Sequence, residues 1–157
     1  MKKIELTKGK YATIDDDDYE LVSKHSWRCV AGYAMTYETG KSHKERKIIL
    51  MHRLINNTPE GFDTDHVNGD RLDNRKENLR TATRSQNCKN KGKSKVDSTS
   101  MFKGVMWDKK SKKWRAYIYD TGRNIYLGLF ELEKDAANAY NEASKNLHGV
   151  FSIQNKV

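Results

Sequence analysis

Four side chains between positions 65 and 87 have the types and spacing of a site that could hydrolyse a phosphodiester. Asp65 directly precedes His66, Asn78 follows that histidine by twelve residues, and Asn87 follows Asn78 by nine. Water is a poor nucleophile at neutral pH, so a neutral imidazole that accepts its proton in the transition state accelerates hydrolysis. A carboxylate and an amide oxygen can hold a hard divalent cation, which stabilises charge on the phosphate and the leaving oxygen. The pattern predicts metal-dependent cleavage with one Mg²⁺ or Mn²⁺ ion.

Local signals predict the elements that position these side chains. The pair Asn68-Gly69 favours a tight turn, which is the strongest short signal for a hairpin. Thr83 and Gln86 have the spacing of a capping box, so a helix is expected to begin there. Asn87 would then lie in the first turn of that helix and face Asp65 on the hairpin.

The segment 51–91, with the run TDHVNGDRLDNRKENLRTATRSQNCKNK, resembles the HNH homing endonucleases of phages and mobile introns. The resemblance implies a strand-loop-strand-helix unit that binds one metal ion. It also implies that His66 is the general base, that Asn78 orients the loop holding it, and that Asp65 and Asn87 bind the metal. The last family position is often His, and Asn87 matches the homing subgroup.

Other interpretations of these residues are weaker. A single histidine after an aspartate is usually a surface feature, and either asparagine alone could be a turn or capping residue. An EF-hand calcium loop fails on register, because Val67 stands where the third ligand belongs and Gly69 comes one residue late. His52 and Arg53 could contact phosphate or pack beside the site, and both alternatives stay open.

Composition limits the class of protein. The chain has 157 residues, 36% of them hydrophobic, and a mean hydropathy of −0.95, so two or three small cores are expected. Its cysteines, Cys29 and Cys88, are far apart, which argues against a disulfide framework and a zinc knuckle. No signal peptide and no apolar run of membrane-spanning length is present, so an intracellular protein without a membrane partner is expected.

Positive charge is concentrated around the predicted site. Residues 71–115 contain 15 Lys or Arg against 4 Asp or Glu, whereas the whole chain carries a formal charge of +9. A basic block of this kind suits a polyanionic substrate, because neutralising phosphates releases condensed counterions. The lysines Lys91, Lys93 and Lys95 lie in a Lys- and Ser-rich linker, where they are expected to meet DNA phosphates.

The region before the site should form a small mixed segment. The acidic run 15–18 places negative charge at the start of a short helix that extends through Lys24, which suits the helix dipole better than it indicates a metal site. A turn is expected at Thr39-Gly40 and a helix over Met51–Ile55. Strands are expected over residues 10–14, 26–30, 33–37 and 47–50.

The C-terminal region alternates apolar and polar residues. Trp114, Ala116 and Ile118 alternate with the exposed candidates Arg115, Tyr117 and Tyr119, and a similar pattern follows the turn at Gly122. An amphipathic helix is then expected from five residues at spacings of three or four, with its end at Gly149: Leu132, Ala136, Tyr140, Ala143 and Leu147. The helix should cover one face of a three-stranded sheet and leave the other face free.

Five motifs follow one another in this region: Lys103-Gly104-Val105, Trp114-Arg115-Ala116, residues 126–130, residues 136–140 and His148-Gly149. Through these motifs the region resembles, over about 50 residues, the DNA-binding domain of plant APETALA-type ethylene-response factors. That family lays its sheet in the major groove of DNA, which admits a β-ribbon. The alignment of motifs places six residues toward DNA: Lys103, Met106, Tyr117, Tyr119, Asn124 and Tyr126. Met106 and Tyr119 depart from the arginines of the plant proteins, so base preference does not carry over.

The sequence thus predicts an α+β protein in four segments. These are an N-terminal segment 1–50, an HNH unit 51–91, a basic linker 92–100 and a DNA-binding domain 101–157. The expected function is that of a DNA endonuclease that binds double-stranded DNA and nicks one strand as a monomer, without an obligate protein partner. The alternative is a non-catalytic DNA-binding regulator with a structural or decayed HNH unit. An RNA-binding protein is a third candidate, but the aromatic motif of an RNA-recognition sheet is missing.

Overall fold

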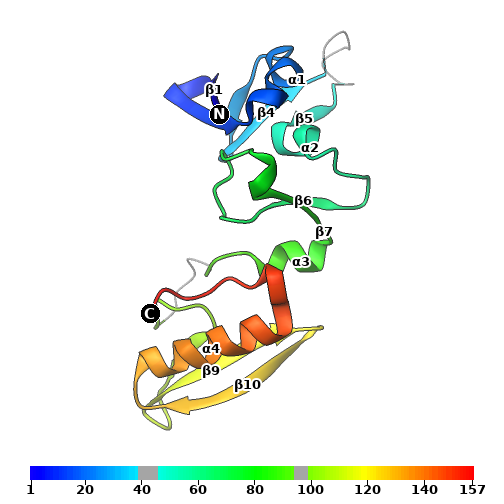
Figure 1. The fold of residues 1–157 in the computed structure, drawn as a ribbon. Coiled ribbons are helices and arrows are strands. Elements are labelled where there is room, and N and C mark those ends of the chain that lie inside the picture. Colours follow the sequence, from blue (N-terminus) through cyan, green and yellow to red (C-terminus); the bar gives the residue numbers. More distant parts are fainter. Residues whose placement is uncertain (39–45, 94–98) are drawn as a thin grey trace. The chain divides into compact units, whose positions relative to one another are not determined.

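Several small antiparallel sheets and a few helices form the chain, so the predicted α+β class is confirmed (Figure 1). A computed structural model describes residues 1–38, 46–93 and 99–157, which divide into two compact units, Met1–Asn87 and Cys88–Val157. The expected turn at Thr39-Gly40 and the predicted phosphate contact Lys95 lie outside the described residues. None of the helices in the described part of the chain is long and apolar enough to cross a membrane.

The first unit begins with two small sheets and short helices. Strands β1 and β2 form a hairpin, and β3, β4 and β5 form a three-stranded sheet in that order. Strands over 10–14 and 33–37 and a helix over 51–55 are confirmed, whereas β1 was not expected. The elements are β1 Lys2–Leu6, β2 Lys10–Ile14, α1 Tyr19–Ser23, β3 Arg28–Val30, β4 Tyr33–Tyr37, β5 Ile48–Leu50 and α2 Met51–Ile55. Short 3-10 turns lie at Thr7–Gly9 and Asp16–Asp18.

One hydrophobic core joins these elements to the predicted site. Ile14 of β2, Val22 of α1 and Met51 of α2 are fully buried in it. Leu79, from the strand that follows the site, packs into the same cluster. Burial of such side chains stabilises the fold by about 1.5–3 kcal/mol each. The N-terminal segment therefore supports the site directly through shared packing.

A hairpin and a short helix follow. Strand β6, Asp63–His66, pairs antiparallel with β7, Leu79–Ala82. Gly69 has a φ of 77° and its N–H donates to the His66 carbonyl at 2.9 Å, so the predicted Asn68-Gly69 turn is present. It does not join the two strands directly, as a two-residue hairpin would, but opens the loop 67–78, whose end is a 3-10 turn at Lys76–Asn78.

The predicted capping box is confirmed at the start of α3, Arg84–Lys89. The Thr83 N–H donates to the Gln86 side-chain oxygen at 2.8 Å, and the Gln86 N–H donates to the Thr83 hydroxyl at 3.2 Å. Both contacts satisfy N–H groups that the first helical turn would otherwise leave unpaired.

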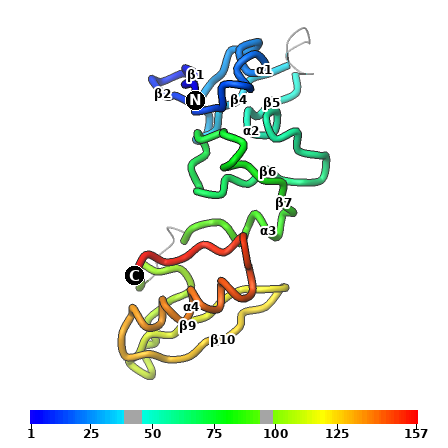
Figure 2. The backbone as a smooth tube through the Cα atoms, in the orientation of Figure 1, coloured from blue at the N-terminus to red at the C-terminus, as the bar shows by residue number. Residues whose placement is uncertain are grey.

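The second unit is a three-stranded sheet with one long helix against it (Figure 2). Its elements are β8 Val105–Asp108, β9 Lys113–Asp120, β10 Arg123–Phe130 and α4 Glu133–His148, followed by a 3-10 turn at Gly149–Phe151. Strand β9 lies between β8 and β10, and Val105 and Ala116 pack against Ala136 and Ala137 of α4. The expected sheet-and-helix arrangement is therefore present in this unit.

Two predicted core positions of this helix are wrong. Leu132 is 62% exposed because it precedes the helix with extended backbone and does not follow the helical period. Leu147 is 42% exposed because the buried row runs through Tyr140, Ser144 and His148 at intervals of four, one position away from it. The predicted end at Gly149 is confirmed, with a φ of 52° at that residue.

Candidate active site

His66 is the last residue of β6 and lies in a pocket of rings. It is 5% exposed, and its imidazole contacts the imidazole of His52 and the phenol ring of Tyr33 at centroid distances of 5.0 and 6.2 Å. Burial lowers the pKa of His66, although Asn74 and nearby carboxylates oppose this effect. The residue therefore stays neutral more readily than a free imidazole, as a general base must.

The placement of Asn74 favours one tautomer of His66. Its Nδ2 donates to the Leu72 carbonyl at 3.2 Å, so its Oδ1 is the atom that faces His66 Nε2, at 3.4 Å. An acceptor at this position favours a proton on Nε2. The lone pair of the neutral ring is then on Nδ1.

Asp65 directly faces Arg80 across the two strands. The Arg80 Nε and Nη2 atoms both donate to Asp65 Oδ2, at 2.8 and 2.6 Å, and both side chains are mostly buried. A buried carboxylate requires a compensating cation or several hydrogen bonds. Arg80 provides such compensation in the protein alone, and sequence analysis did not single it out.

Asn78 connects the two ends of the loop that follows His66. Its Oδ1 accepts a hydrogen bond from the Asn68 N–H at 2.9 Å, and its Nδ2 donates to the Asp73 carbonyl at 2.7 Å. Its own carbonyl accepts from the Val67 N–H at 2.9 Å. These bonds hold the chain just after His66 in one conformation, which is the geometry that an orienting residue needs.

Asn87 of α3 contacts Asp63 of β6. Its Nδ2 donates to Asp63 Oδ2 at 2.8 Å, and this bond is the largest cause of the lowered pKa of Asp63. Asp63 and Asp65 share one face of β6, since alternate residues of a strand point the same way. The Asn87 amide thus reaches the face of β6 that carries Asp65, through its contact with Asp63.

These residues fit a hard divalent cation by their chemistry. Asp65 offers a carboxylate. The amide nitrogen of Asn87 is held by Asp63, so the amide oxygen of Asn87 points away from the Asp63 carboxylate. Oxygen donors of these kinds are those that Mg²⁺ and Mn²⁺ take. Over residues 1–38, 46–93 and 99–157, no group of three or more His, Cys, Asp or Glu side chains is placed to hold a metal ion.

The two residues left open by sequence analysis have different surroundings. The Arg53 guanidinium donates to the carbonyls of Phe62, Thr58 and Pro59 at 2.6 to 3.3 Å and so helps to fix the loop that leads into β6. His52 packs edge-on against the His66 ring instead. Sequence position alone could not separate these roles, since the two residues are adjacent on one short helix.

The sheet of the second unit presents most of the predicted DNA contacts on the face away from α4. Strand pairing places Tyr126 opposite Tyr117, and Asn124 opposite Tyr119. Tyr119 and Tyr126 are 61% and 60% exposed. Tyr117 is half-buried, and the remaining exposed candidates are Met106, Arg115 and Asn124. The Arg115 guanidinium is paired with Asp108.

A bulge in β10 adds an unexpected residue to this outer face. The register shifts between Tyr126 and Gly128, where φ is 135°, and Leu129 then pairs with Arg115 and is exposed. An extra residue in one strand reverses its inward and outward alternation. The sequence signal for the bulge is Gly128 itself.

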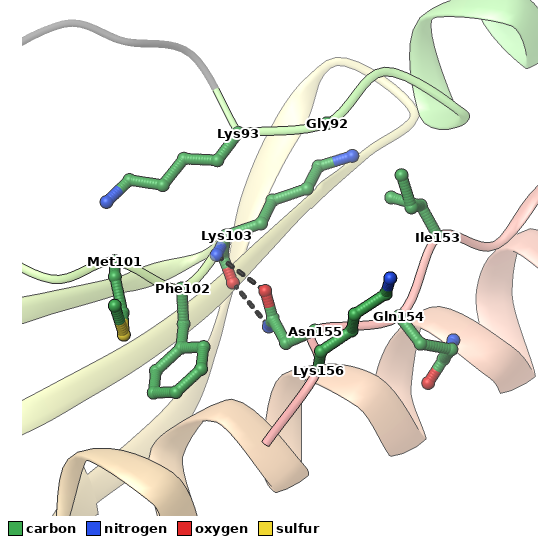
Figure 3. A pocket seen from close by; sticks show the side chains of 9 residues that line it. All are labelled: Gly92, Lys93, Met101, Phe102, Lys103, Ile153, Gln154, Asn155 and Lys156. Atoms are coloured by element: carbon green, nitrogen blue, oxygen red, sulfur yellow. Dashed lines mark hydrogen bonds between the residues drawn. The ribbon is translucent and has the colours of Figure 1, made fainter. Parts of the chain in front are cut away.

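Lys103 does not present its ammonium on the sheet face. Its Nζ donates to the carbonyls of Lys89 and Lys91 at 2.9 and 2.5 Å, and burial lowers its pKa. Figure 3 shows the pocket beside it, where the Asn155 side chain hydrogen-bonds the Lys103 backbone at 2.7 and 3.0 Å. Lys93 also lines this pocket, and Lys91 is exposed.

Comparison with known proteins connects both units to named families. Residues 57–89 match the HNH endonuclease family model, and an uncharacterized HNH endonuclease of Acanthamoeba polyphaga mimivirus is 30% identical over 96% of this chain and 77% of its own. The chain belongs to the HNH endonuclease family. Protein 3.8 of Escherichia phage T7 is 31% identical over 60% of this HNH chain and 76% of its own.

Residues 100–149 match the AP2 domain model. The AP2-like ethylene-responsive transcription factor TOE2 of Arabidopsis thaliana is 30% identical to this HNH protein over 42% of the chain, which is 14% of the plant protein. No solved structure matches the chain. The two resemblances seen in the sequence are therefore both confirmed, and together they support a nuclease that binds DNA.

Proposed function

We propose that this HNH endonuclease hydrolyses phosphodiester bonds of double-stranded DNA with one divalent metal ion, Mg²⁺ or Mn²⁺, and nicks one strand per monomer. The observation that carries the proposal is the surroundings of β6. A buried imidazole, whose pKa is lowered by burial, follows a buried carboxylate in the chain, and Asn78 holds the loop that comes next. These are the parts that hydrolysis by an activated water needs.

In the proposed reaction, His66 takes a proton from the attacking water on Nδ1, while Nε2 keeps its proton against Asn74. Asp65 and Asn87 would hold the metal ion, and Asn78 keeps the backbone after His66 fixed. A bound divalent ion supplies Lewis-acid stabilisation of charge on the phosphate and the leaving oxygen.

The C-terminal unit is proposed to hold the target DNA on its outer sheet face. Tyrosine, arginine and asparagine side chains on a sheet can read base edges in the major groove. Lysines of the preceding segment, Lys91, Lys93 and Lys95, are proposed to meet phosphates, which position the protein without reading sequence. The Lys103 ammonium is not included in this surface, because it is held by two carbonyls.

A plasmid assay tests the proposal. Supercoiled plasmid is incubated with the full chain in Mg²⁺, Mn²⁺ or EDTA, with Asp65→Ala as the matched variant. We expect conversion to open circles in either ion, none in EDTA, and a strong loss with Asp65→Ala. Plasmid binding without any nicking would instead support the alternative function, a non-catalytic DNA-binding regulator.

A further inference from the structure

Three rings from separate parts of the first unit contact one another around the predicted base. His52 of α2, Tyr33 of β4 and His66 of β6 have centroid distances of 5.0, 5.2 and 6.2 Å. All three fall within the range of 4.5–7 Å in which aromatic pairs attract. Neither His52 nor Tyr33 belongs to residues 57–89, which match the HNH family model.

The two added rings are themselves held firmly. Tyr33 lies under the Arg71 guanidinium, 4.6 Å from the ring centroid, and Arg71 in turn donates to the Ala31 carbonyl at 3.0 Å. His52 is 5% exposed and belongs to α2, next to fully buried Met51. A ring that touches fixed neighbours on two sides has few rotamers left to it.

The placement of the His66 ring matters if this residue is the base. Its contact with Asn74 is long, at 3.4 Å, and such a bond is weak. A catalytic base displaced by about 1 Å can lose about 10²-fold in rate. The rings that pack against this imidazole therefore help to hold it in place.

We propose that His52 and Tyr33 are positioning residues for His66, so that the segment before the HNH match completes the active site. His52 acts through its ring, which packs edge-on against His66 at an interplanar angle of 73°. Its Nδ1 is buried and, among the residues that the structure describes, has no hydrogen-bond partner. Phenylalanine at position 52 therefore keeps the relevant contact and removes an unsatisfied atom.

The proposal rests on the proposed function, in which His66 is the base. The test therefore combines variants of the two positioning residues with a variant of His66 itself. Two quantities are measured: the single-turnover nicking rate at saturating protein, and the affinity for DNA. The variants are His52→Ala, His52→Phe, Tyr33→Ala and Tyr33→Phe. We expect each alanine variant to lower the nicking rate by about 10²-fold at unchanged affinity. We expect each phenylalanine variant to keep a rate close to that of wild type.

A double-mutant cycle separates positioning from damage to the fold. In a His66→Ala background, His52→Ala should cause no further loss, because the ring that it positions is gone. Ile55→Ala, a core change on the same helix as His52, should lower the nicking rate equally in both backgrounds. Tyr37→Ala changes an exposed tyrosine on the same strand as Tyr33 and should have little effect on the nicking rate.

NMR of the imidazole C–H groups gives a readout that does not require activity. The His66 signals, assigned by their loss in His66→Ala, should shift and broaden in His52→Ala and stay close to wild type in His52→Phe. Wild-type nicking or unchanged His66 signals in His52→Ala would overturn the proposal, and so would equal losses in His52→Phe and His52→Ala. If both His66→Ala and His52→Ala nick at the wild-type rate, His66 is not the base. A shift of the His66 signals in His52→Ala would then still support the contact between the two rings, but not its role in catalysis.

Discussion

Arg80 binds Asp65 through two hydrogen bonds that end on the same carboxylate oxygen, at 2.6 and 2.8 Å. The pair lies across β6 and β7, with Asp65 6% and Arg80 18% exposed at the side chain. The Arg80 guanidinium thus meets, in the protein alone, the carboxylate that is proposed to hold a metal ion. Arg80 therefore compensates the charge of Asp65 within the protein itself.

Arg80→Ala should therefore destabilise the first unit. Removing one partner of a buried pair costs about 3–5 kcal/mol, because the carboxylate keeps its desolvation penalty. A divalent ion at Asp65 would offset part of that loss, so Mg²⁺ should raise the melting temperature of Arg80→Ala more than that of wild type. Thermal unfolding with and without Mg²⁺ measures both effects, and a variant as stable as wild type would show that the pair contributes little.

The outer sheet face should contribute to DNA affinity. Tyr119→Ala and Tyr126→Ala together should weaken binding to duplex DNA while leaving melting temperature nearly unchanged, since both side chains are about 60% exposed. Tyr11→Ala, an exposed tyrosine of the first unit, is the matched control and should bind normally. Fluorescence anisotropy at fixed salt provides the measurement, and equal affinity of all three proteins would remove this face from the interface.

Gly104 is required by the packing of the second unit. Its φ is 75°, and a Cβ there would lie 2.1 Å from the Tyr140 ring and 2.5 Å from the Tyr117 carbonyl oxygen. Gly104→Ala should destabilise this unit by about 2–5 kcal/mol through overpacking and backbone strain. Gly122→Ala has similar strain, with a φ of 85°, but open space around the new carbon, and should cost only about 1–2 kcal/mol. Equal melting temperatures of the two variants would contradict the steric argument.

Acid should destabilise the first unit through His52. Burial lowers the pKa of His52 to about 3, against an ordinary value of 6.5. Between these values the unfolded chain binds more protons, so the free energy of unfolding falls as pH drops from 6.5 toward 3, by up to about 1.4 kcal/mol per pH unit. His52→Phe removes this contribution and should lose stability less steeply. Urea unfolding from pH 7.5 to 4 tests this, and parallel curves for the two proteins would argue against it.

Short-range signals in the sequence were sufficient for several elements. The capping box at Thr83 and Gln86 formed as expected because its contacts lie within four residues and need no tertiary partner. Alternation also predicted the sheet of the second unit. Alternation failed at the bulge before Gly128, where β10 has one residue more than its partner strand. One extra residue reverses which side chains lie on each face of a strand.

Long-range neighbours in the site could not be predicted in the same way. Asn87 was expected to face Asp65, but its amide donates to Asp63. This contact depends on where α3 lies after β7, which the spacing of residues in the sequence does not determine. The His52 contact with His66 joins α2 to β6, and the Arg80 contact with Asp65 depends on strand register. Sequence analysis indicated the four candidate residues, whereas packing determined the neighbours that tune them.

The central claim is that His66 is the general base of metal-dependent DNA cleavage. Single-turnover nicking of one defined duplex by His66→Ala, at saturating protein and in Mg²⁺, tests it most directly, with DNA affinity measured in parallel. If His66 is the base, the rate should fall by about 10² to 10⁴-fold, the usual effect of losing a positioned acid-base group, with affinity little changed. A His66→Ala protein that nicks the duplex at the wild-type rate would contradict the claim.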